Sequence, residues 1–260
     1  MINTILQGSV ETRLKDIPDE FVDCVITSPP YWQLRDYGVE GQLGLEPHFN
    51  EFIDRLCNIF DEIKRILKPT GTVFVNLGDS YSGNKEGKTD NKVSQYLKDT
   101  TTNLHKKAVI QEKSLCLIPE RFAIEMVNRG WYCRNVLIWH KPNAMPNSAE
   151  DRFSIDFEQV FFFVKSKIYT FEQQLEKSLW ADKDSRFLNG PSSGGKAVSG
   201  NYAINKGGAF RDDGMRNKRA VWTVNTKPFS EAHFATYPEE LIAPMIKAGC
   251  PKGGIVLDPF

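Results

Sequence analysis

Apolar residues recur along the chain with two periods, one typical of strands and the other of helices. A short apolar run at residues 21–26, rich in β-branched side chains, predicts a buried strand. Pro29 and Pro30 end this strand because neither can donate a hydrogen bond to a sheet. Between residues 49 and 67, apolar side chains recur at spacings of three and four opposite a charged face, which predicts an amphipathic helix.

Strands and helices continue to alternate to the end of the chain. Residues 69–71, Pro-Thr-Gly, are expected to stop the helix, and residues 71–77 predict the next strand. A strand, a helix and a strand with short connections indicate a βαβ unit with a parallel sheet. The later predicted elements are a helix from Pro119 capped by Gly130, strands at residues 131–140 and 157–164, a helix at residues 238–247 capped by Gly249, and a final strand that ends at Asp258.

Two segments interrupt this pattern. Residues 81–113 are polar, and their lysines outnumber their acidic residues, so they predict either a solvated insertion or a lid that contacts phosphates. Residues 169–221 are rich in glycine, serine and asparagine and predict a small, loop-rich lobe. This lobe is either a flexible insertion or a surface for base and phosphate contacts. Its basic residues cluster near its end: Arg211, Arg216, Lys218 and Arg219.

The composition is that of a globular chain. Its 260 residues, 40% of them hydrophobic and 25% charged, suffice for one sizeable core. No apolar run approaches the roughly 20 residues of a membrane-spanning helix, and no basic region precedes an apolar stretch at the N-terminus, so we expect no secretory signal. The five widely spaced cysteines lack a C-x-x-C pair, and most of them are expected to be core residues. A disulfide framework or a zinc site is not expected, so the expected compartment is the reducing cytoplasm.

The 33 basic and 33 acidic residues cancel. A nucleic-acid partner is therefore not indicated by the total charge, and only the distribution of charge can indicate one.

The most informative chemistry follows the first strand, in the sequence Thr27-Ser28-Pro29-Pro30-Tyr31. Active sites of open α/β sheets lie at the carboxyl ends of the strands. A rigid hydroxyl, exposed proline carbonyls and an aromatic ring suit a flat polar group such as a nucleobase. The segment is either an ordinary turn whose tyrosine packs into the core, or a binding surface, which the following Trp32 and the polar loop from Arg35 to Gly38 favour.

Residues 26–31 resemble the catalytic signature of the S-adenosylmethionine-dependent amino-methyltransferases of bacterial restriction–modification systems and phages. The serine at position 28 is similar to the cytosine-N4 branch, whereas the adenine-N6 branch more often has Asp or Asn there. Residues 233–238 resemble the segment that precedes the family's cofactor strand, and residues 256–260 resemble the start of its cofactor loop. The catalytic motif precedes the cofactor motif, which is the permuted, β-type order.

The resemblance implies an α/β, Rossmann-like methyltransferase sheet that is largely parallel, has helices on both faces and is circularly permuted. It implies a catalytic part at residues 1–168, a target-recognition lobe at 169–221 and the start of the cofactor-binding part at 222–260. The family's glycine loop would follow Phe260, so the resemblance also implies truncation at the cofactor-loop strand. A further C-terminal segment or a second chain would then complete the site. A homodimer is a separate expectation.

The resemblance further implies roles for individual residues. The expected catalytic residues are Ser28, Pro29, Pro30 and Tyr31. S-adenosylmethionine is expected to contact His233, Phe234, Asp258, Pro259 and Phe260. Double-stranded DNA is expected to contact Trp32, Arg35, Arg211, Arg216, Lys218 and Arg219. No metal is expected.

Such enzymes flip the target base out of the duplex and stack it on aromatic residues, here Tyr31 with Trp32 beside it. If the Ser28 hydroxyl and the Pro29 carbonyl accept the two hydrogens of the exocyclic amine, its lone pair turns toward the methyl sulfonium. Positioning and electrostatics then carry the step, because serine is too weak a base to remove the proton first. No covalent intermediate is required.

Three alternatives remain open from the sequence. They are the N6 amine of adenine as the target, a DNA-binding module or subunit that is inactive without a partner, and RNA as the substrate. The role of Asp79 is also open. It follows the strand at residues 71–77 and either faces the same cleft or forms a turn.

Overall fold

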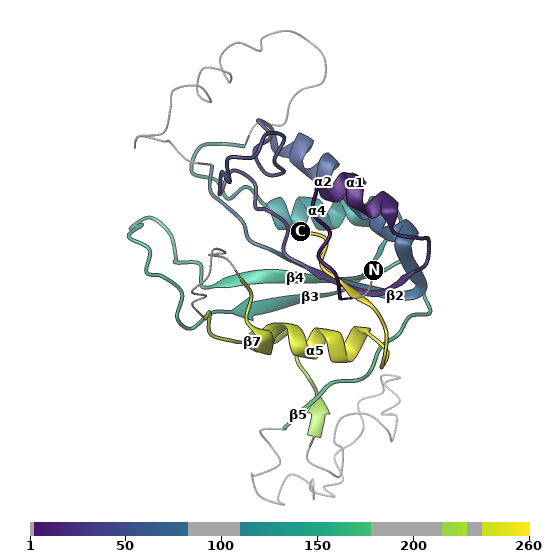
Figure 1. Ribbon diagram of the computed structural model, residues 1–260. Helices are drawn as coiled ribbons and strands as arrows, with labels where there is room; N and C mark the ends of the chain where they lie inside the picture. The colour runs from purple at the N-terminus through teal and green to yellow at the C-terminus, as the bar shows by residue number, and fades with distance from the viewer. Residues whose placement is uncertain (1–2, 83–109, 178–214, 228–235) are drawn as a thin grey trace, which may run out of the picture. The chain divides into compact units, whose positions relative to one another are not determined.

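The computed structural model describes residues 3–82, 110–177, 215–227 and 236–260. Contacts between residues divide the chain into two compact units, of which one comprises Met1–Phe171 with Ala220–Phe260 and the other Glu172–Arg219. In the first unit, a twisted sheet lies between helices on its two faces (Figure 1).

The sheet has six strands in the order β7-β3-β4-β2-β1-β8. Strand β1 pairs in parallel with β2 and β8, and β3 pairs in parallel with β7, whereas β4 is antiparallel to both of its neighbours. Five strands therefore run in one direction, and the predicted largely parallel α/β sheet is confirmed. The strands are β1 (Val22–Thr27), β2 (Leu67–Leu77), β3 (Tyr132–His140), β4 (Phe157–Val164), β7 (Val221–Thr223) and β8 (Val256–Leu257).

Helices cover both faces of the sheet, as expected. Helices α2 (Phe49–Ile66) and α4 (Ile118–Asn128) pack on one face, and α5 (Glu239–Gly249) packs on the other (Figure 1). Neighbouring residues of β2 alternate between these faces, since Val73 and Val75 join the cluster with α2 and α4 while Phe74 joins the cluster with α5. Strand β1 and the second half of β2 are buried on both faces, and their sequences are accordingly rich in apolar residues.

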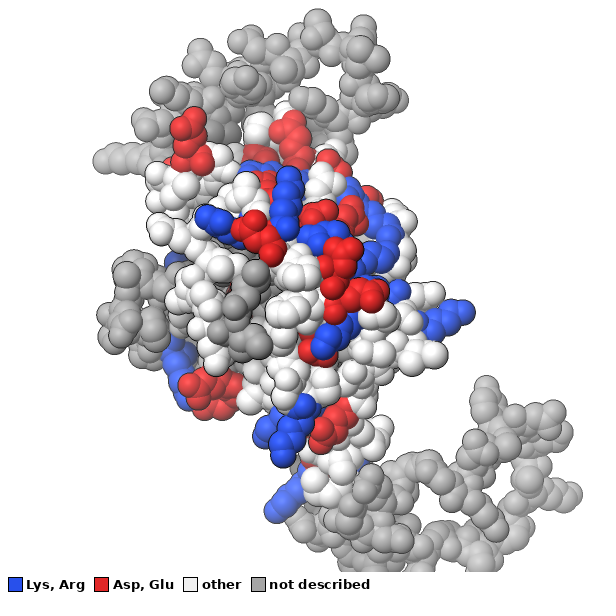
Figure 2. Space-filling model, turned by 45° about the vertical axis from the view of Figure 1, so that its right-hand side comes forward, with Lys and Arg blue, Asp and Glu red and all other residues white. Residues whose placement is uncertain are grey.

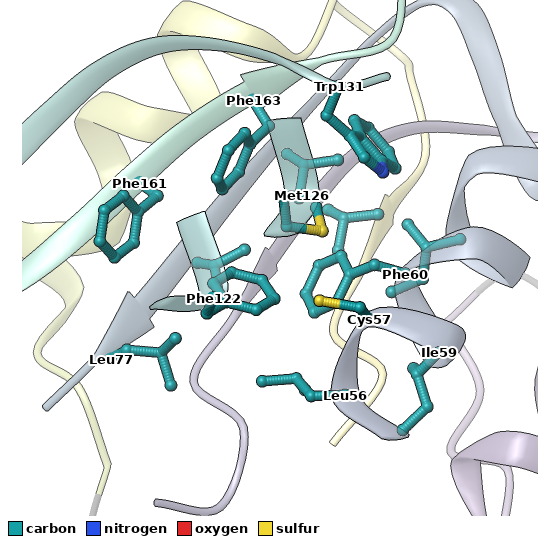
Figure 3. Packing of buried hydrophobic residues seen from close by; sticks show 14 of the residues in the cluster. Leu56, Cys57, Ile59, Phe60, Leu77, Phe122, Met126, Trp131, Phe161 and Phe163 are labelled. Carbon is teal, nitrogen blue, oxygen red and sulfur yellow. The ribbon is translucent and has the colours of Figure 1, made fainter. Parts of the chain in front are cut away.

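Aromatic rings fill the face beneath α2 and α4. Phe122 lies at the centre of this cluster, and its ring meets Phe60, Phe161 and Phe163 edge to face at centroid distances of 5.2, 6.4 and 6.0 Å (Figure 3). All four rings are buried. This packing joins α2, α4 and β4 into one core. Helix α1 (Val10–Arg13) and the 3-10 turn η1 (Leu14–Asp16) precede β1, and Leu14 is part of the same cluster.

The predicted boundary between the first helix and the second strand differs from the structure. Strand β2 begins at Leu67, directly after α2, because Leu67 already pairs with Val22 of β1. The Pro-Thr-Gly segment at residues 69–71 therefore lies inside the strand, and the prediction that it forms the stop between helix and strand was wrong.

Gly249 is not a cap, because it is the last residue of α5 and Cys250 follows it in extended conformation. Thr72 donates a hydrogen bond to the Gly249 carbonyl at 2.9 Å. A Cβ at Gly249 would lie 2.3 Å from the Thr72 hydroxyl and 2.8 Å from the Phe74 ring. The glycine thus permits the close approach of α5 to β2. Gly130, in contrast, has φ +81° just after α4, as a capping glycine requires.

The second unit contains a two-stranded antiparallel ladder of β5 (Leu175–Lys177) and β6 (Met215–Asn217). Lys218 extends the pairing by donating its backbone N–H to Gln174 O at 2.9 Å. The predicted interior of the lobe, residues 178–214, and most of the lysine-rich segment, residues 83–109, lie outside the described residues.

All five cysteines are free thiols, and Cys24, Cys57 and Cys116 are buried as expected, while Cys133 is exposed. In the described ranges, no helix is both long and apolar enough to span a bilayer. These ranges also hold no cluster of three or more histidine, cysteine or acidic side chains able to bind a metal ion.

We predict that Gly249→Ala destabilises the protein, because the new methyl group would overlap Thr72 and Phe74 across the α5–β2 contact. Overpacking of this kind costs about 1–3 kcal/mol. Chemical denaturation measures the loss, and Lys247→Ala, an exposed position on the same helix, serves as the control. Equal stability of the two variants would contradict the close approach.

Candidate active site

The turn after β1 and the residues after β8 meet at one edge of the sheet. Because β1 and β8 are parallel neighbours, their carboxyl ends lie side by side. Thr27 donates a hydrogen bond to Asp258 Oδ1 at 2.6 Å, and Tyr237 donates to the other oxygen of the same carboxylate. Segments more than 200 residues apart in sequence, the predicted catalytic and cofactor motifs, are thus joined.

Tyr31 is half-buried and is held on several sides. Its ring lies against the backbone of Gly78, where a Cβ would come within 2.5 Å of Tyr31 Cε2. Its hydroxyl donates to Glu158 Oε2 at 2.8 Å, and Asn76 Oδ1 lies 3.3 Å away as a second acceptor. Burial, and then the negative charge of Glu158, raise the pKa of the Tyr31 phenol well above its usual value near 10. The ring also packs against the main core, so it is both a core residue and part of a polar site.

Ser28 lies next to this hydroxyl, with its Oγ 3.5 Å from Tyr31 Oη. Pro29 is buried, and Pro30 is half-buried. The two prolines hold the backbone between Ser28 and Tyr31 in a restricted conformation. The predicted catalytic residues therefore lie together at the carboxyl edge of the sheet.

Glu158 and Lys141 also belong to this edge, although the sequence analysis did not single them out. Glu158 Oε1 forms an ion pair with the Lys141 ammonium, and both side chains are mostly enclosed. Lys141 follows β3, and its Nζ lies 4.1 Å from the centroid of the Trp139 ring. The sequence does show that the polar residues of the apolar run at residues 157–164 lie at its N-terminal end. This end lies at the carboxyl edge of the sheet only because β4 is antiparallel to its neighbours, and the sequence does not give that direction.

Asp79 forms a turn and caps a helix. Its carboxylate accepts the backbone N–H groups of Ser80, Leu117 and Ile118 at 2.9, 2.8 and 3.1 Å. The last two belong to the N-terminus of α4, where backbone donors lack partners within the helix. Burial raises the pKa of this carboxyl group, and the backbone hydrogen bonds oppose the rise. Of the two open interpretations of Asp79, the structure supports the turn.

Asp258 is an exposed residue, and its carboxylate accepts hydrogen bonds from the hydroxyls of Thr27 and Tyr237 and from the backbone N–H of Phe260. Beside it, a small cavity of about 10 Å³ opens between β1, β2, β4 and α5, lined by Thr27, Asn76 and Tyr237 together with apolar side chains. Pro259 and Phe260 continue from Asp258, and Phe260 is exposed. His233 and Phe234, which were predicted for the same site, lie outside the described residues.

The residues predicted to contact DNA belong to both compact units, with Trp32 and Arg35 in the first and Arg216, Lys218 and Arg219 in the second. Trp32 packs toward α2, since its indole N–H donates to Glu46 O at 2.8 Å and its ring meets Phe49 edge to face. Arg35 is exposed. Trp32 therefore braces the loop instead of presenting a free ring, which limits its predicted role as a stacking neighbour.

In the second unit, Arg216 and Arg219 share one carboxylate. Both donate to Glu176 Oε1, at 2.9 and 3.0 Å. Burial raises the pKa of Glu176, but the hydrogen bonds from the two arginines outweigh it and lower the pKa. The predicted basic cluster is therefore partly neutralised within its own unit. Arg211, its remaining arginine, lies outside the described residues. Figure 2 shows basic and acidic side chains interspersed on the visible face of the protein.

A largely parallel sheet with helices on both faces, and polar side chains gathered at its carboxyl edge, is the arrangement of α/β proteins that bind ligands at that edge. Residues 22–260 match the family model of the N6 and N4 DNA methylases. The chain belongs to this family and is a DNA methyltransferase, which confirms the family predicted from the sequence.

Individual relatives agree with this assignment. The chain is 39% identical over 264 residues to the Type II methyltransferase M.XycI from Xanthomonas campestris pv. cyanopsidis, an alignment that spans 99% of this chain and 76% of that protein. Among solved structures, the cytosine-N4-specific PvuII DNA methyltransferase matches with a TM-score of 0.60 at 15% identity, covering 96% of this chain and 71% of that one. TTHA0409 from Thermus thermophilus, in complex with S-adenosyl-L-methionine, matches with a TM-score of 0.54 at 19% identity, covering 97% and 76%. At these identities the two structures show a shared fold.

The raised pKa of Tyr31 predicts a loss of stability in alkaline solution. The unfolded chain releases this phenolic proton near pH 10, while the folded protein retains it. The contribution of the protonated phenol to the free energy of unfolding is therefore complete below pH 10. Above pH 10, the difference in Tyr31 ionisation lowers the free energy of unfolding by about 1.4 kcal/mol for each pH unit.

Tyr31→Phe removes this linkage. We therefore expect the free energy of unfolding of the variant to fall less steeply between pH 10 and pH 11 than that of the unmodified protein. Urea denaturation at pH 8, 10 and 11 measures both slopes, and the pH 8 values correct for the general effect of the substitution. Equal slopes would show that Tyr31 ionises as readily in the folded protein as in the unfolded chain.

Proposed function

We propose that this protein transfers a methyl group from S-adenosylmethionine to the exocyclic N4 amine of a cytosine flipped out of double-stranded DNA. The observation that carries the proposal is the arrangement at the carboxyl edge, where the Ser28 hydroxyl lies in a rigid turn and Thr27 joins that turn to Asp258. Membership of the methylase family supports DNA as the substrate. Ser28 and the likeness to the cytosine-N4-specific PvuII enzyme favour cytosine over adenine.

The residues present fit the proposed cofactor. Asp258 offers an exposed carboxylate held by two hydroxyl donors, and this suits the ammonium group of the methionine part. The apolar side chains of Pro259 and Phe260 follow directly. We infer that these three residues hold the cofactor, with His233 and Phe234 as further proposed contacts. Bound there, S-adenosylmethionine would supply an electrophilic methyl group on a sulfonium centre.

Ser28 and the Pro29 carbonyl are proposed to accept the two hydrogens of the target amine. The amine of cytosine is a poor nucleophile because its lone pair is delocalised into the ring. Two acceptors at fixed positions favour the geometry in which this lone pair leaves the ring plane, so orientation and electrostatics contribute most of the effect. The half-buried Tyr31 ring is proposed to stack on the flipped base, and its contact with Gly78 supports this role by fixing the plane of the ring.

We further propose that the protein is the modification enzyme of a restriction–modification system in the cytoplasm, because M.XycI is a Type II methyltransferase. The compact unit Glu172–Arg219 falls within the segment proposed for target recognition, residues 169–221. Residues 1–168 and 222–260 are the proposed catalytic and cofactor-binding parts, in the permuted order.

Ser28→Ala is expected to lower kcat for methyl transfer by about 100-fold, because it removes a positioned hydrogen-bond partner of the reacting group. Transfer of a labelled methyl group to duplex DNA measures the rate. Ser166→Ala is the matched control, since Ser166 follows the carboxyl end of the antiparallel β4 and thus lies at the opposite edge of the sheet. Unchanged kcat in Ser28→Ala would contradict the role of this hydroxyl.

Mass spectrometry of nucleosides from the methylated DNA identifies the target base. We expect N4-methylcytosine, because Ser28 stands where the adenine-specific branch more often has an acidic or amide side chain. N6-methyladenine as the product would contradict the choice of base while leaving the methyltransferase activity intact. Competition between DNA and RNA of the same sequence tests the choice of polymer.

If the basic cluster contacts phosphates, Arg219→Ala should weaken DNA binding and reduce the slope of log K against log[salt] by about 0.9. Glu176→Gln should have the opposite effect, because it removes the carboxylate that Arg216 and Arg219 share. Fluorescence anisotropy at several salt concentrations measures both. Arg13→Ala, which alters an exposed pair with Asp16, is the control, and equal slopes in all variants would assign the cluster to a solvated surface.

A further inference from the structure

A continuous line of polar contacts leads from Lys141 to Ser28. Lys141 pairs with Glu158 Oε1, and Glu158 Oε2 accepts the hydroxyl hydrogen of Tyr31 at 2.8 Å. Tyr31 Oη in turn lies 3.5 Å from Ser28 Oγ. Four side chains from three separate segments of the chain thus form one line that ends at the proposed catalytic hydroxyl.

The hydrogen bonds along this line have a defined direction. An ammonium group only donates and a carboxylate only accepts, so the pair of Lys141 and Glu158 fixes the first two contacts. The single hydrogen of Tyr31 is committed to Glu158, and its oxygen is left as an acceptor toward Ser28. Ser28 therefore donates its own hydrogen to Tyr31, and the lone pairs of Ser28 face the other way.

This direction matters for the proposed reaction. Ser28 has to accept a hydrogen from the target amine, and a hydroxyl group that is free to rotate can instead point its own hydrogen at the amine. A second acceptor for Tyr31, Asn76 Oδ1, lies farther away at 3.3 Å. The charged contact to Glu158 is the shorter and the stronger of the two.

The ion pair is itself well held. The Lys141 and Glu158 side chains are 16% and 19% exposed, and the Lys141 ammonium lies over the Trp139 ring. Since little solvent surrounds them, the charges hold their partners more firmly than an exposed pair would.

We propose that Glu158 and Lys141 are positioning residues, which act through the Tyr31 hydroxyl to keep Ser28 a hydrogen-bond acceptor for the target amine. This inference rests on the function proposed above. Neither residue is assigned to the reacting atoms. Their proposed effect on kcat depends on the Tyr31 hydroxyl, whereas a general structural role would not depend on it.

A double-mutant cycle between Glu158 and Tyr31 tests the proposal. Glu158→Gln keeps the shape but replaces an acceptor by a group that can also donate. It is expected to lower kcat for methyl transfer by about 10- to 100-fold, as for the loss of a hydrogen bond to a charged group. KM for DNA and for S-adenosylmethionine should stay within about threefold of the original values.

In the Tyr31→Phe background, the same change should alter kcat by less than about threefold, because the hydroxyl through which Glu158 acts is gone. Equal losses in both backgrounds would overturn the proposal, and so would unchanged kcat in Glu158→Gln. Glu62→Gln is the matched control, since Glu62 pairs with Arg65 near the end of α2 at the opposite edge of the sheet. If Glu158→Gln does not fold, Lys141→Met replaces it in the same cycle, with Lys141→Arg as the variant that retains the charge.

A second readout does not depend on activity. Tyrosine labelled with ¹³C at Cζ reports on its hydroxyl by NMR, and Glu158→Gln should shift the Tyr31 resonance while Glu62→Gln should not. If the unmodified protein transfers no methyl group to DNA, the proposed function fails while the NMR result still tests the contact. If transfer is observed and the cycle is additive, the inference fails and the proposed function stands.

Discussion

The connection between β3 and β4 spans only residues 141–156 and contains no helix, so β4 returns antiparallel to β3 and pairs antiparallel with β2 as well. This reversal determines which side chains meet at the edge where β1, β2 and β3 end. A parallel β4 would bring its carboxyl end to that edge. In the antiparallel arrangement its first residues lie there, and Glu158 reaches the hydroxyl of Tyr31 from the next strand but one. The site depends on this single change of direction.

Close packing on the two faces of the sheet makes the edge rigid enough to hold these contacts. On one face, Phe122 fills the space between α2 and β4, and on the other, Gly249 lets α5 approach β2 at hydrogen-bonding distance. Gly78 likewise permits a close contact at the edge of the sheet, because a glycine has no Cβ that would overlap the Tyr31 ring. Glycine in these two positions is required by space, since neither has a positive φ.

The periodicity of the sequence predicts much of this fold. Residues 157–164 are a strand in both the prediction and the structure, and the helix predicted at residues 49–67 differs from α2 by one residue. Periodicity says which residues alternate but not in which direction a strand runs, so it could not place Glu158 beside Tyr31. Gly249 is a second residue whose role could not be predicted from the local sequence. A glycine near a helix end is typical of a cap, and only the position of β2 shows that this glycine permits a close contact between α5 and β2. The turn at residues 27–31 was found because the effect of proline on the backbone is local, whereas the partners of this turn come from distant segments.

Asp258 and Glu158, two of the carboxylates at this edge, differ in what surrounds them, and we connect this difference with different tasks. Asp258 accepts hydrogen bonds from neutral groups, namely two hydroxyls and the backbone N–H of Phe260, so these donors do not neutralise its negative charge, which remains available to a cationic group. Glu158 is paired with Lys141, so its charge is compensated and what remains is a directed acceptor for one phenol. A carboxylate that is exposed and uncompensated suits ligand binding, and one that is enclosed and paired suits orientation. Thr27 contacts Asp258, and its neighbour Ser28 contacts Tyr31, which is bonded to Glu158. The turn after β1 therefore connects the two carboxylates.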